Sequence, residues 1–333
     1  MDLPPLSNPP PGLPRLPQRI AKLRWLHDRL NEFTYALTAS KTSLELNTIA
    51  DFFIHEKIVS ISKLAELFSN SEIKYLRETG VVSEIIPNEL KANFSICTWN
   101  SFSIWSDRWP HRNPSWKLAV YKPGFDSVFL LQTLPRRRCE DFLDLCTGTG
   151  IQAFYAAIHS QNVLGIDINP RCVQMARMNA EFNGIKNVQF RVSSIFNGLS
   201  HCRRFDILVA NTPFIPKKMD DLPLFSDGGK DGGDHGRAIL ENLKNLLKRN
   251  GYFQILTTAW ALPFLRNTWR FKKYWDLFCI SSNDSNDMLL VCGKPGCGRL
   301  NILNPCGLNP QKSSFSQTME YLCRSIRRFQ FNG

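Results

Sequence analysis

The chain has 333 residues, of which 43% are hydrophobic and 21% charged, and its formal net charge is +12. These values are ordinary for a globular protein, and the length suits two domains. The apolar runs are all shorter than the roughly 18–20 residues that a membrane span needs, and prolines interrupt the N-terminus where a secretion signal has its apolar core. We therefore expect a cytoplasmic protein without membrane contact.

The positive charge and the cysteines both suggest ligands. A basic surface permits a polyanionic partner such as nucleic acid, but the Lys and Arg residues are scattered, which favours a solvated surface instead. Cys292, Cys297 and Cys306 raise the possibility of zinc, yet they lack a CxxC pair and a histidine at ligand spacing. We predict no metal site and reduced thiols.

The N-terminal third is predicted to form an arm and a small domain. Residues 1–17 hold seven prolines and indicate an extended, disordered arm. Within residues 18–122, apolar spacing predicts short helices at Ser62–Leu67 and Ser71–Thr79, with Gly80 ending the second. This suggests a helical, winged-helix-like domain. Such modules bind DNA, but they also act as lids and dimer contacts, and the mixed charges of the second helix favour those roles.

Short β-like runs end this domain, and a regular alternation follows it. The runs are Phe94–Trp99, Phe102–Trp105 and Leu118–Tyr121, which fit a wing or a connecting sheet. Residues 123–333 then predict, in order, strand Phe142–Leu145, helix Ile151–His159, strand Val163–Ile168, helix Pro170–Phe182, strands Val188–Val192 and Phe205–Ala210, helix Arg237–Lys248 and strand Tyr252–Thr257. Alternation of this kind predicts an α/β fold with a parallel, Rossmann-like sheet covered on both faces.

The last two predicted strands, Trp275–Ile280 and Met288–Cys292, follow each other without an amphipathic helix. They predict an antiparallel hairpin at the edge of the sheet.

A glycine turn after the first strand of the sheet predicts a nucleotide site. The segment reads Asp144-Leu-Cys-Thr147-Gly148-Thr-Gly150, followed by Ile-Gln-Ala, which fits G-x-G-x-x-A. Glycines here let a ligand approach the backbone. Both NAD enzymes and S-adenosylmethionine (SAM) enzymes need this, so the motif alone does not separate them.

Two aspartates refine that prediction. Asp144 ends the strand where a carboxylate can meet the ammonium group of SAM, whereas it is unfavourable beside a dinucleotide pyrophosphate. Asp167 ends the next strand, with Ile168 after it, and can accept hydrogen bonds from both ribose hydroxyls. After the third strand Ser194 stands where SAM enzymes commonly place an adenine-binding Asp, and Ile195 can pack on the ring. We predict SAM as the cofactor.

The fourth strand ends in Asn211-Thr212-Pro213-Phe214. Ligands of open α/β sheets lie at the carboxyl ends of the strands, so this segment should border the transferred methyl group, with Asn211 near the cofactor as well. Asn211-Thr-Pro-Phe resembles the Asn-Pro-Pro-Tyr/Phe motif of methyltransferases that act on planar nitrogens.

Together with DLCTGTG, GIDINPRCVQMARMNAEFNG and SDGGKDGGDHGRAI, the motif resembles the class I methyltransferases of release-factor glutamine and of ribosomal RNA bases. The resemblance spans roughly Lys122 to Thr258, and the N-terminal part is similar to a two-domain bacterial form.

This resemblance implies roles for the four motif residues. The Asn211 side-chain oxygen and the Thr212 carbonyl would accept the two N–H bonds of the acceptor nitrogen and fix its lone pair, Pro213 would rigidify the turn, and Phe214 would stack on the flat substrate. Thr212 departs from the family proline. The glycine-rich loop Asp227–Gly236 implies a flexible lid, with Asp234 capping the next helix, and Asp126 and Ser127 match a segment that covers SAM.

The sequence leaves the acceptor open. A substrate protein, a nucleic acid or a small metabolite or natural product all fit a methyltransferase that modifies a planar nitrogen. Two other classes remain as alternatives, an NAD-dependent oxidoreductase and a DNA-binding regulator with a degenerate enzyme fold. The first gives Asn211-Thr-Pro-Phe214 no use, and the intact site motifs argue against the second.

Overall fold

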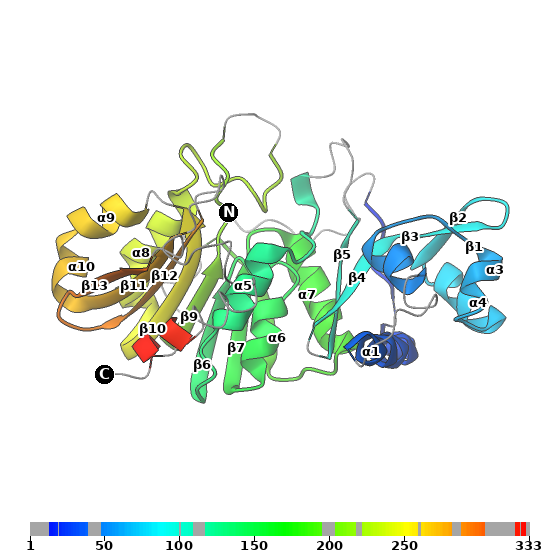
Figure 1. Cartoon of the computed structure of the whole chain (residues 1–333), viewed down its shortest axis with the longest axis horizontal. Helices are drawn as coiled ribbons and strands as arrows, with labels where there is room; N and C mark the ends of the chain where they lie inside the picture. The colour runs from blue at the N-terminus through cyan, green and yellow to red at the C-terminus, as the bar shows by residue number, and fades with distance from the viewer. Residues whose placement is uncertain are drawn as a thin grey trace, which may run out of the picture.

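The computed structural model describes residues 13–18, 20–38, 48–99, 101–108, 117–194, 204–217, 222–258, 261–281, 288–303, 324–326 and 328–330. A smaller N-terminal part lies beside a larger α/β part, and helix α7 stands between them (Figure 1). Across the described ranges, the helices are all too short or too polar to traverse a lipid bilayer.

The N-terminal part mixes helices with short strands. Its elements are η1 (Ile20–Leu23), α1 (Arg24–Thr38), η2 (Ala50–Ile54), β1 (Val59–Ser60), α3 (Ile61–Leu64), α4 (Asn70–Glu78), β2 (Val82–Ile86), β3 (Glu89–Ala92), β4 (Phe94–Trp99) and β5 (Phe102–Asp107). Strands β1, β3 and β2 form one antiparallel sheet, and β4 pairs with β5. The two predicted helices are present as α3 and α4. The part is not simply helical, and its likeness to a winged helix stays an interpretation.

Local sequence explains the ends of α4. Ser69 accepts a hydrogen bond from the backbone N–H of Glu72, whose carboxylate accepts one from the Ser69 N–H in return, which is a capping box. Gly80 follows the helix with φ of 75°, a conformation that glycine adopts at little cost.

The α/β part is built on one eight-stranded sheet, which confirms the predicted α/β fold and adds one strand that was not predicted. Its elements are α5 (Phe125–Thr133), β6 (Cys139–Leu145), α6 (Ile151–Ala157), β7 (Ser160–Asp167), α7 (Pro170–Phe182), β8 (Val188–Val192), β9 (Phe205–Asn211), α8 (Asp234–Leu246), β10 (Leu247–Thr258), α9 (Ala261–Asn267), α10 (Trp269–Tyr274), β11 (Trp275–Ser281), β12 (Met288–Pro295) and β13 (Leu300–Leu303). The strand order is β13-β11-β12-β10-β9-β6-β7-β8, and β8, β7, β6, β9 and β10 run parallel.

Two strand predictions need correction. β11 and β12 form the expected antiparallel hairpin, but β12 lies inside the sheet, between β10 and β11, and β13 pairs parallel to β11 on the outside. The predicted strand Leu118–Tyr121 is irregular, because Val120 bonds to both the backbone and the side chain of Asp107 instead of joining a ladder.

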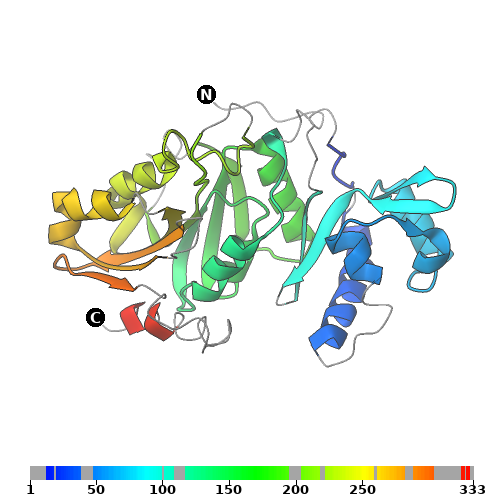
Figure 2. The ribbon, with the colours of Figure 1, turned by 45° about the horizontal axis from the view of Figure 1, so that its top comes forward.

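Side-chain alternation along the strands fills two apolar layers. Phe142 of β6 packs with α5, α6 and α7, whereas its neighbour Leu143 packs with α8, α9 and α10 on the opposite face. Figure 2 shows these helices on the two sides of the strands. Residues buried on both faces explain why the parallel strands are nearly continuous apolar runs in the sequence.

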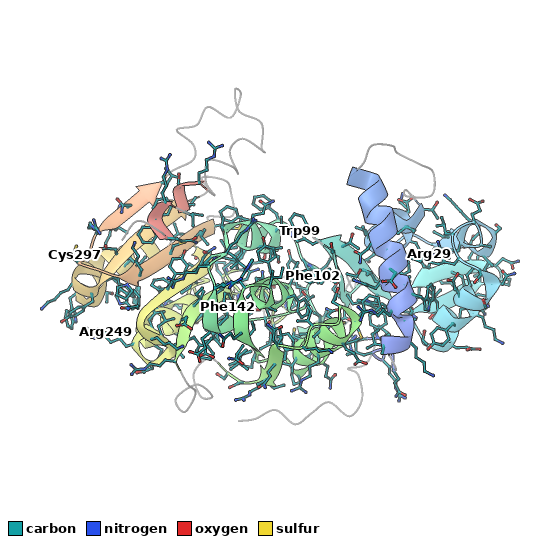
Figure 3. All side chains as sticks on the ribbon, turned by 90° about the horizontal axis from the view of Figure 1, so that it is seen from below. Arg29, Trp99, Phe102, Phe142, Arg249 and Cys297 are labelled. Carbon is teal, nitrogen blue, oxygen red and sulfur yellow. The ribbon has the colours of Figure 1, made fainter. Side chains whose placement is uncertain are left out.

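Two asparagines join the N-terminal part to α7. Asn179 exchanges hydrogen bonds with both backbone groups of Trp105, at 3.0 Å each, and Asn183 does the same with Ser103. In Figure 3, Trp99 and Phe102 lie at the tip of the β4–β5 hairpin, and both side chains contact the core of the α/β part. The β4–β5 hairpin therefore belongs structurally to both parts.

The end of the proline arm also contacts the α/β part. Arg171, the second residue of α7, donates to the Pro14 carbonyl at 3.0 Å and to Asp107 at 2.7 Å. Leu13 is buried. Residues 13–17 are thus packed against the protein and not free as expected, whereas residues 1–12 lie outside the described ranges.

Candidate active site

A cavity of about 1330 Å³ opens at the carboxyl ends of the parallel strands. Most of the predicted site residues line it, namely Thr147, Gly148, Asp167, Ile168, Ser194, Asn211, Thr212, Pro213 and Phe214. Asp144 and Gly150 lie behind this lining, and Ile195 falls outside the described residues. The topology therefore brings together residues from four strand ends that are far apart in the sequence.

The two glycines of the turn after β6 serve different purposes. Gly148 has φ of 53°, and a Cβ added there would meet no atom within 4 Å, so the residue leaves this side of the turn open to the cavity. Gly150 has φ of 87°, and a Cβ there would lie 2.6 Å from the Phe154 ring. Gly150 is therefore required for packing between the turn and α6, and Gly148 for its backbone conformation.

Asp144 holds the glycine turn after β6 through a hydrogen bond on the side away from the cavity. Its side chain is buried and accepts a hydrogen bond of 2.6 Å from the Thr147 hydroxyl, which itself lines the cavity. Burial raises the pKa of Asp144 to about 7, and the nearby charge of Asp167 contributes in the same direction. The expected contact with a ligand ammonium stays a prediction, since Asp144 faces the turn through Thr147.

Asp167 is held by backbone groups at the end of β7. One carboxylate oxygen accepts from the Gly148 N–H and the other from the Asn169 N–H, each at 2.9 Å. Each oxygen can accept a second hydrogen bond, as two ribose hydroxyls require. Burial raises the pKa of Asp167. Next to it, Ile168 is 47% exposed and offers an apolar surface inside the cavity.

Asn211 presents an unpaired acceptor at the end of β9. Its Nδ2 donates to Asp126 at 2.8 Å, while its Oδ1 is buried and has no hydrogen-bond partner among the described residues. A buried oxygen without a partner costs roughly 1–3 kcal/mol, which an arriving N–H group would recover. The site is therefore suited to a ligand that donates a hydrogen bond at this point.

Thr212 makes hydrogen bonds that the proline of the resembling motif could not make. Its backbone N–H and its hydroxyl both donate to the Leu256 carbonyl, at 3.2 Å and 2.9 Å, and the side chain is buried. These bonds tie the end of β9 to β10, which a proline could do through neither group.

The glycine-rich loop clamps the segment after Asn211. A Cβ on Gly228 would lie 2.8 Å from the Phe214 Cα, and one on Gly232 would lie 2.4 Å from the Phe214 carbonyl oxygen. Backbone hydrogen bonds join Ile215 to this loop at Ser226 and Gly228. The glycines thus permit close packing, and the expectation that they make a flexible lid stays a prediction.

The prediction for Asp234 is also corrected. Gly233 is the N-cap of α8, without a side-chain cap, and Asp234 is the first helical residue. Its carboxylate instead pairs with Arg237 at 2.6 Å.

Two aromatic residues of the site escaped the sequence reasoning. Tyr121 stacks on Phe225, with ring centroids 5.0 Å apart, and its hydroxyl donates to Asp126 at 3.2 Å. Both rings line the cavity. Tyr121 stands out locally as an aromatic residue just before Pro123-Gly124. Its stacking partner Phe225 lies about a hundred residues further along the chain, so local sequence does not indicate the pair.

Comparison with known proteins agrees with this geometry. Residues 138–287 match a family model described as a methyltransferase domain. A protein named as an N5-glutamine methyltransferase of Methanocaldococcus jannaschii is 34% identical over 146 residues, which are 42% of this chain and 73% of the relative. The release factor glutamine methyltransferase of Aliivibrio fischeri is 42% identical over 78 residues, 23% of this chain and 28% of the relative.

The matches to release factor glutamine methyltransferases span between 22% and 52% of the length of those relatives. Among solved structures, an rRNA methylase from Streptococcus thermophilus has a TM-score of 0.37 and 14% identity, over 50% of this chain and 92% of that one, too weak a similarity to bear on function. The match that covers 73% of the Methanocaldococcus jannaschii relative shows the family of this chain. The chain belongs to the family of SAM-dependent methyltransferases that includes the protein N5-glutamine methyltransferases.

Proposed function

We propose that the protein transfers the methyl group of SAM to a planar amide nitrogen, and that the acceptor is a side-chain amide of a protein. The observation that carries this proposal is the buried Oδ1 of Asn211, at the carboxyl end of β9. This acceptor has no hydrogen-bond partner among the described residues. An amide NH₂ group is a donor that fits it.

The cavity residues fit SAM as the methyl donor. The turn at Gly148 is open, and Asp167 can accept hydrogen bonds from ribose hydroxyls. Ile168 and Ser194 line the same cavity and would hold the adenine. Bound SAM would supply an activated methyl group on its sulfonium, and its transfer to the acceptor nitrogen would leave S-adenosylhomocysteine. The nitrogen would then lose one proton to solvent, because methylation makes it cationic and that proton acidic. The carboxylate of Asp144 favours a cationic cofactor over a dinucleotide pyrophosphate, whereas Asp167 would suit the ribose of either cofactor.

The chain's own residues would prepare the nitrogen for this attack. An amide nitrogen is a poor nucleophile because its lone pair is delocalised into the carbonyl. When Asn211 Oδ1 and the Thr212 carbonyl accept its two N–H bonds, they direct the lone pair towards the methyl group and stabilise the charge that develops on nitrogen. Phe214, which lines the cavity, would stack on the amide plane.

The charge of the cavity favours a protein amide over a nucleic-acid base. The described lining includes five aspartates and no Lys or Arg side chain, in contrast to the net charge of +12 of the whole chain. Arg237 pairs with Asp231 and Asp234, and Lys217 pairs with Asp227 at 3.8 Å. This leaves Asp126 and Asp167 to repel a phosphate backbone. The glutamine acceptors named for two relatives point the same way.

Labelled SAM separates the possible acceptors. The purified protein is incubated with tritiated SAM and a cell lysate, and the product is treated in separate portions with protease and with nuclease. We expect protease to release the label and acid hydrolysis to yield methylamine from an N-methyl amide. Release by nuclease would identify a nucleic acid instead, and label in the small-molecule fraction would identify a metabolite. Either result would overturn the proposed acceptor.

A further inference from the structure

We propose that Asp126 is a positioning residue that fixes which way the Asn211 amide faces. This inference rests on the proposed function, because it concerns the group that receives the acceptor N–H. Asp126 lies in the first turn of α5, 85 residues before Asn211, and its Oδ2 accepts from Asn211 Nδ2 at 2.8 Å. The Ser127 hydroxyl lies further from the same nitrogen, at 3.4 Å.

The amide of an asparagine can face either way, and its neighbours decide which. An ionised carboxylate only accepts hydrogen bonds, so it stabilises the orientation in which Nδ2 points at it. In the reverse orientation, Asn211 Oδ1 would face the Asp126 carboxylate, two acceptors in repulsion, and an NH₂ group would face the acceptor nitrogen. That orientation cannot accept the acceptor N–H. Asp126 therefore determines whether the site is competent.

Asp126 is itself held in place from the other side. Its Oδ1 accepts from the Tyr121 hydroxyl, whose ring stacks on Phe225. Burial raises the pKa of Tyr121, so its hydroxyl stays a donor at neutral pH. A Cβ on Gly124 would lie 2.3 Å from the Tyr121 hydroxyl oxygen, so a glycine at this position is what lets Tyr121 reach Asp126. Tyr121, Asp126 and Asn211 thus form a chain of hydrogen bonds that ends at the unpaired oxygen.

Asp126→Asn tests the proposal with little change of shape. The new side chain can donate as well as accept, so both orientations of Asn211 become available. We expect turnover with tritiated SAM and the lysate protein fraction to fall at least tenfold, because a charge-assisted hydrogen bond is replaced by a neutral one. The dissociation constant for SAM should stay within threefold. Asp206→Asn is the matched control, since Asp206 lies at the opposite end of β9 and pairs with Lys248; it should leave both quantities within twofold of wild type.

A spectroscopic readout keeps the test independent of the acceptor. Isotope labelling of asparagine gives side-chain amide NMR signals, and those of Asn211 are identified by their loss in Asn211→Ala. In Asp126→Ala, which adds no new amide, the Asn211 signals should shift and exchange with solvent at least tenfold faster.

The outcomes separate this proposal from the proposed function. Unchanged Asn211 signals in Asp126→Ala, or turnover within twofold of wild type in Asp126→Asn, would overturn the positioning role. Equal losses of turnover and SAM affinity would also overturn it, because Asp126 would then act on the cofactor. If the wild-type protein transfers no methyl group at all, the proposed function fails, and the Asn211 signals still decide whether Asp126 orients the amide.

Discussion

At the scale of single residues, the candidate site places two acidic groups at a glycine turn, with Asp144 buried behind it and Asp167 lining the cavity. Asp144 and Asp167 both have raised pKa values, mainly through burial. The charge of Asp167 also raises the pKa of Asp144, and burial and both charges raise the pKa of the Cys146 thiol. Such a cost persists in proteins mainly where function requires it. A cationic ligand in the neighbouring cavity would relieve it.

Asp144 should make the stability of the protein depend on pH. Its pKa is about 7 in the folded protein against 3.8 ordinarily, so between these values the folded state binds more protons than the unfolded one. The associated stability is present below about pH 4 and is lost as the pH rises through 7. The free energy of unfolding, measured with urea, should fall from pH 5 to pH 8 in the wild type. In Asp144→Asn this fall should be smaller by roughly 2–4 kcal/mol. An equal decrease in both would contradict the raised pKa.

Thr212 gives a second prediction at this scale. Thr212→Pro restores the family residue but removes two donors to the Leu256 carbonyl, so we expect the free energy of unfolding to fall by roughly 2 kcal/mol. Thr212→Val removes only the hydroxyl and should cost about half as much. Denaturant unfolding of the three proteins provides the measurement. A stabilised proline variant would show that these hydrogen bonds do not explain the departure.

How far the sequence predicted the site depended on how local each signal was. The glycine turn and the strand-end residues Asp167 and Asn211 were found because the ends of parallel strands meet at one edge. The hydrogen bond from Asn211 to Asp126 joins residues 85 positions apart and left no trace in local spacing. The same holds for the packing of Gly228 and Gly232 against Phe214, which the glycine content of the loop does not predict.

At the scale of elements, the loop between β9 and α8 packs against the proposed catalytic segment Asn211–Phe214. Gly232→Ala should lower turnover at least tenfold, because its Cβ would approach the Phe214 carbonyl oxygen to 2.4 Å and displace the segment that carries Asn211. Gly80→Ala is the matched control. Gly80 also has a positive φ, of 75°, but a Cβ there would meet nothing within 4 Å.

The comparison of Gly232→Ala with Gly80→Ala separates the effect of the steric clash with Phe214 from the effect of backbone strain at a positive φ. Both should lose about 1 kcal/mol of stability through the positive φ, as judged by thermal unfolding, but only Gly232→Ala should lose activity. Similar activities in the two variants would mean that the loop does not position the segment.

Elements also mark where the sequence failed on the fold. The strands of the parallel part were found within a few residues because they are buried on both faces. β13 was missed, since four residues with two exposed side chains carry no apolar pattern. Its pairing with β11 depends on a partner strand that the sequence places far outside the local window.

At the scale of the whole molecule, the two parts are joined along α7, through Asn179 and Asn183 towards its C-terminal end and through Arg171 at its N-terminal end. Arg171 and Asp107 form an ion pair that is almost fully buried, and Arg171 also holds the end of the proline arm through Pro14. Asp107 in turn bonds to Val120, in the segment that leads to Asp126. One buried pair therefore links the arm, the N-terminal part and the approach to the cavity.

Removing one partner of the Arg171–Asp107 pair should lower the free energy of unfolding more than replacing both partners with apolar residues. Arg171→Met leaves Asp107 buried without its partner, and we expect a loss of roughly 3–5 kcal/mol in the free energy of unfolding. Arg171→Met combined with Asp107→Leu should recover at least half of that loss, because no uncompensated charge remains. Denaturant unfolding of the single and double variants measures both. Additive losses would mean that the contact with Pro14 and the packing of α7 matter more than the charge pair.

The most direct test of the account concerns Asn211 itself. SAM affinity by calorimetry and methyl transfer to the protein fraction are measured for wild type and for Asn211→Ala. The account predicts that turnover falls at least a hundredfold while the dissociation constant for SAM stays within a few-fold, because Asn211 acts on the acceptor nitrogen. Equal losses of both quantities, or full activity in the variant, would contradict the assignment of Asn211 and with it the proposed reaction.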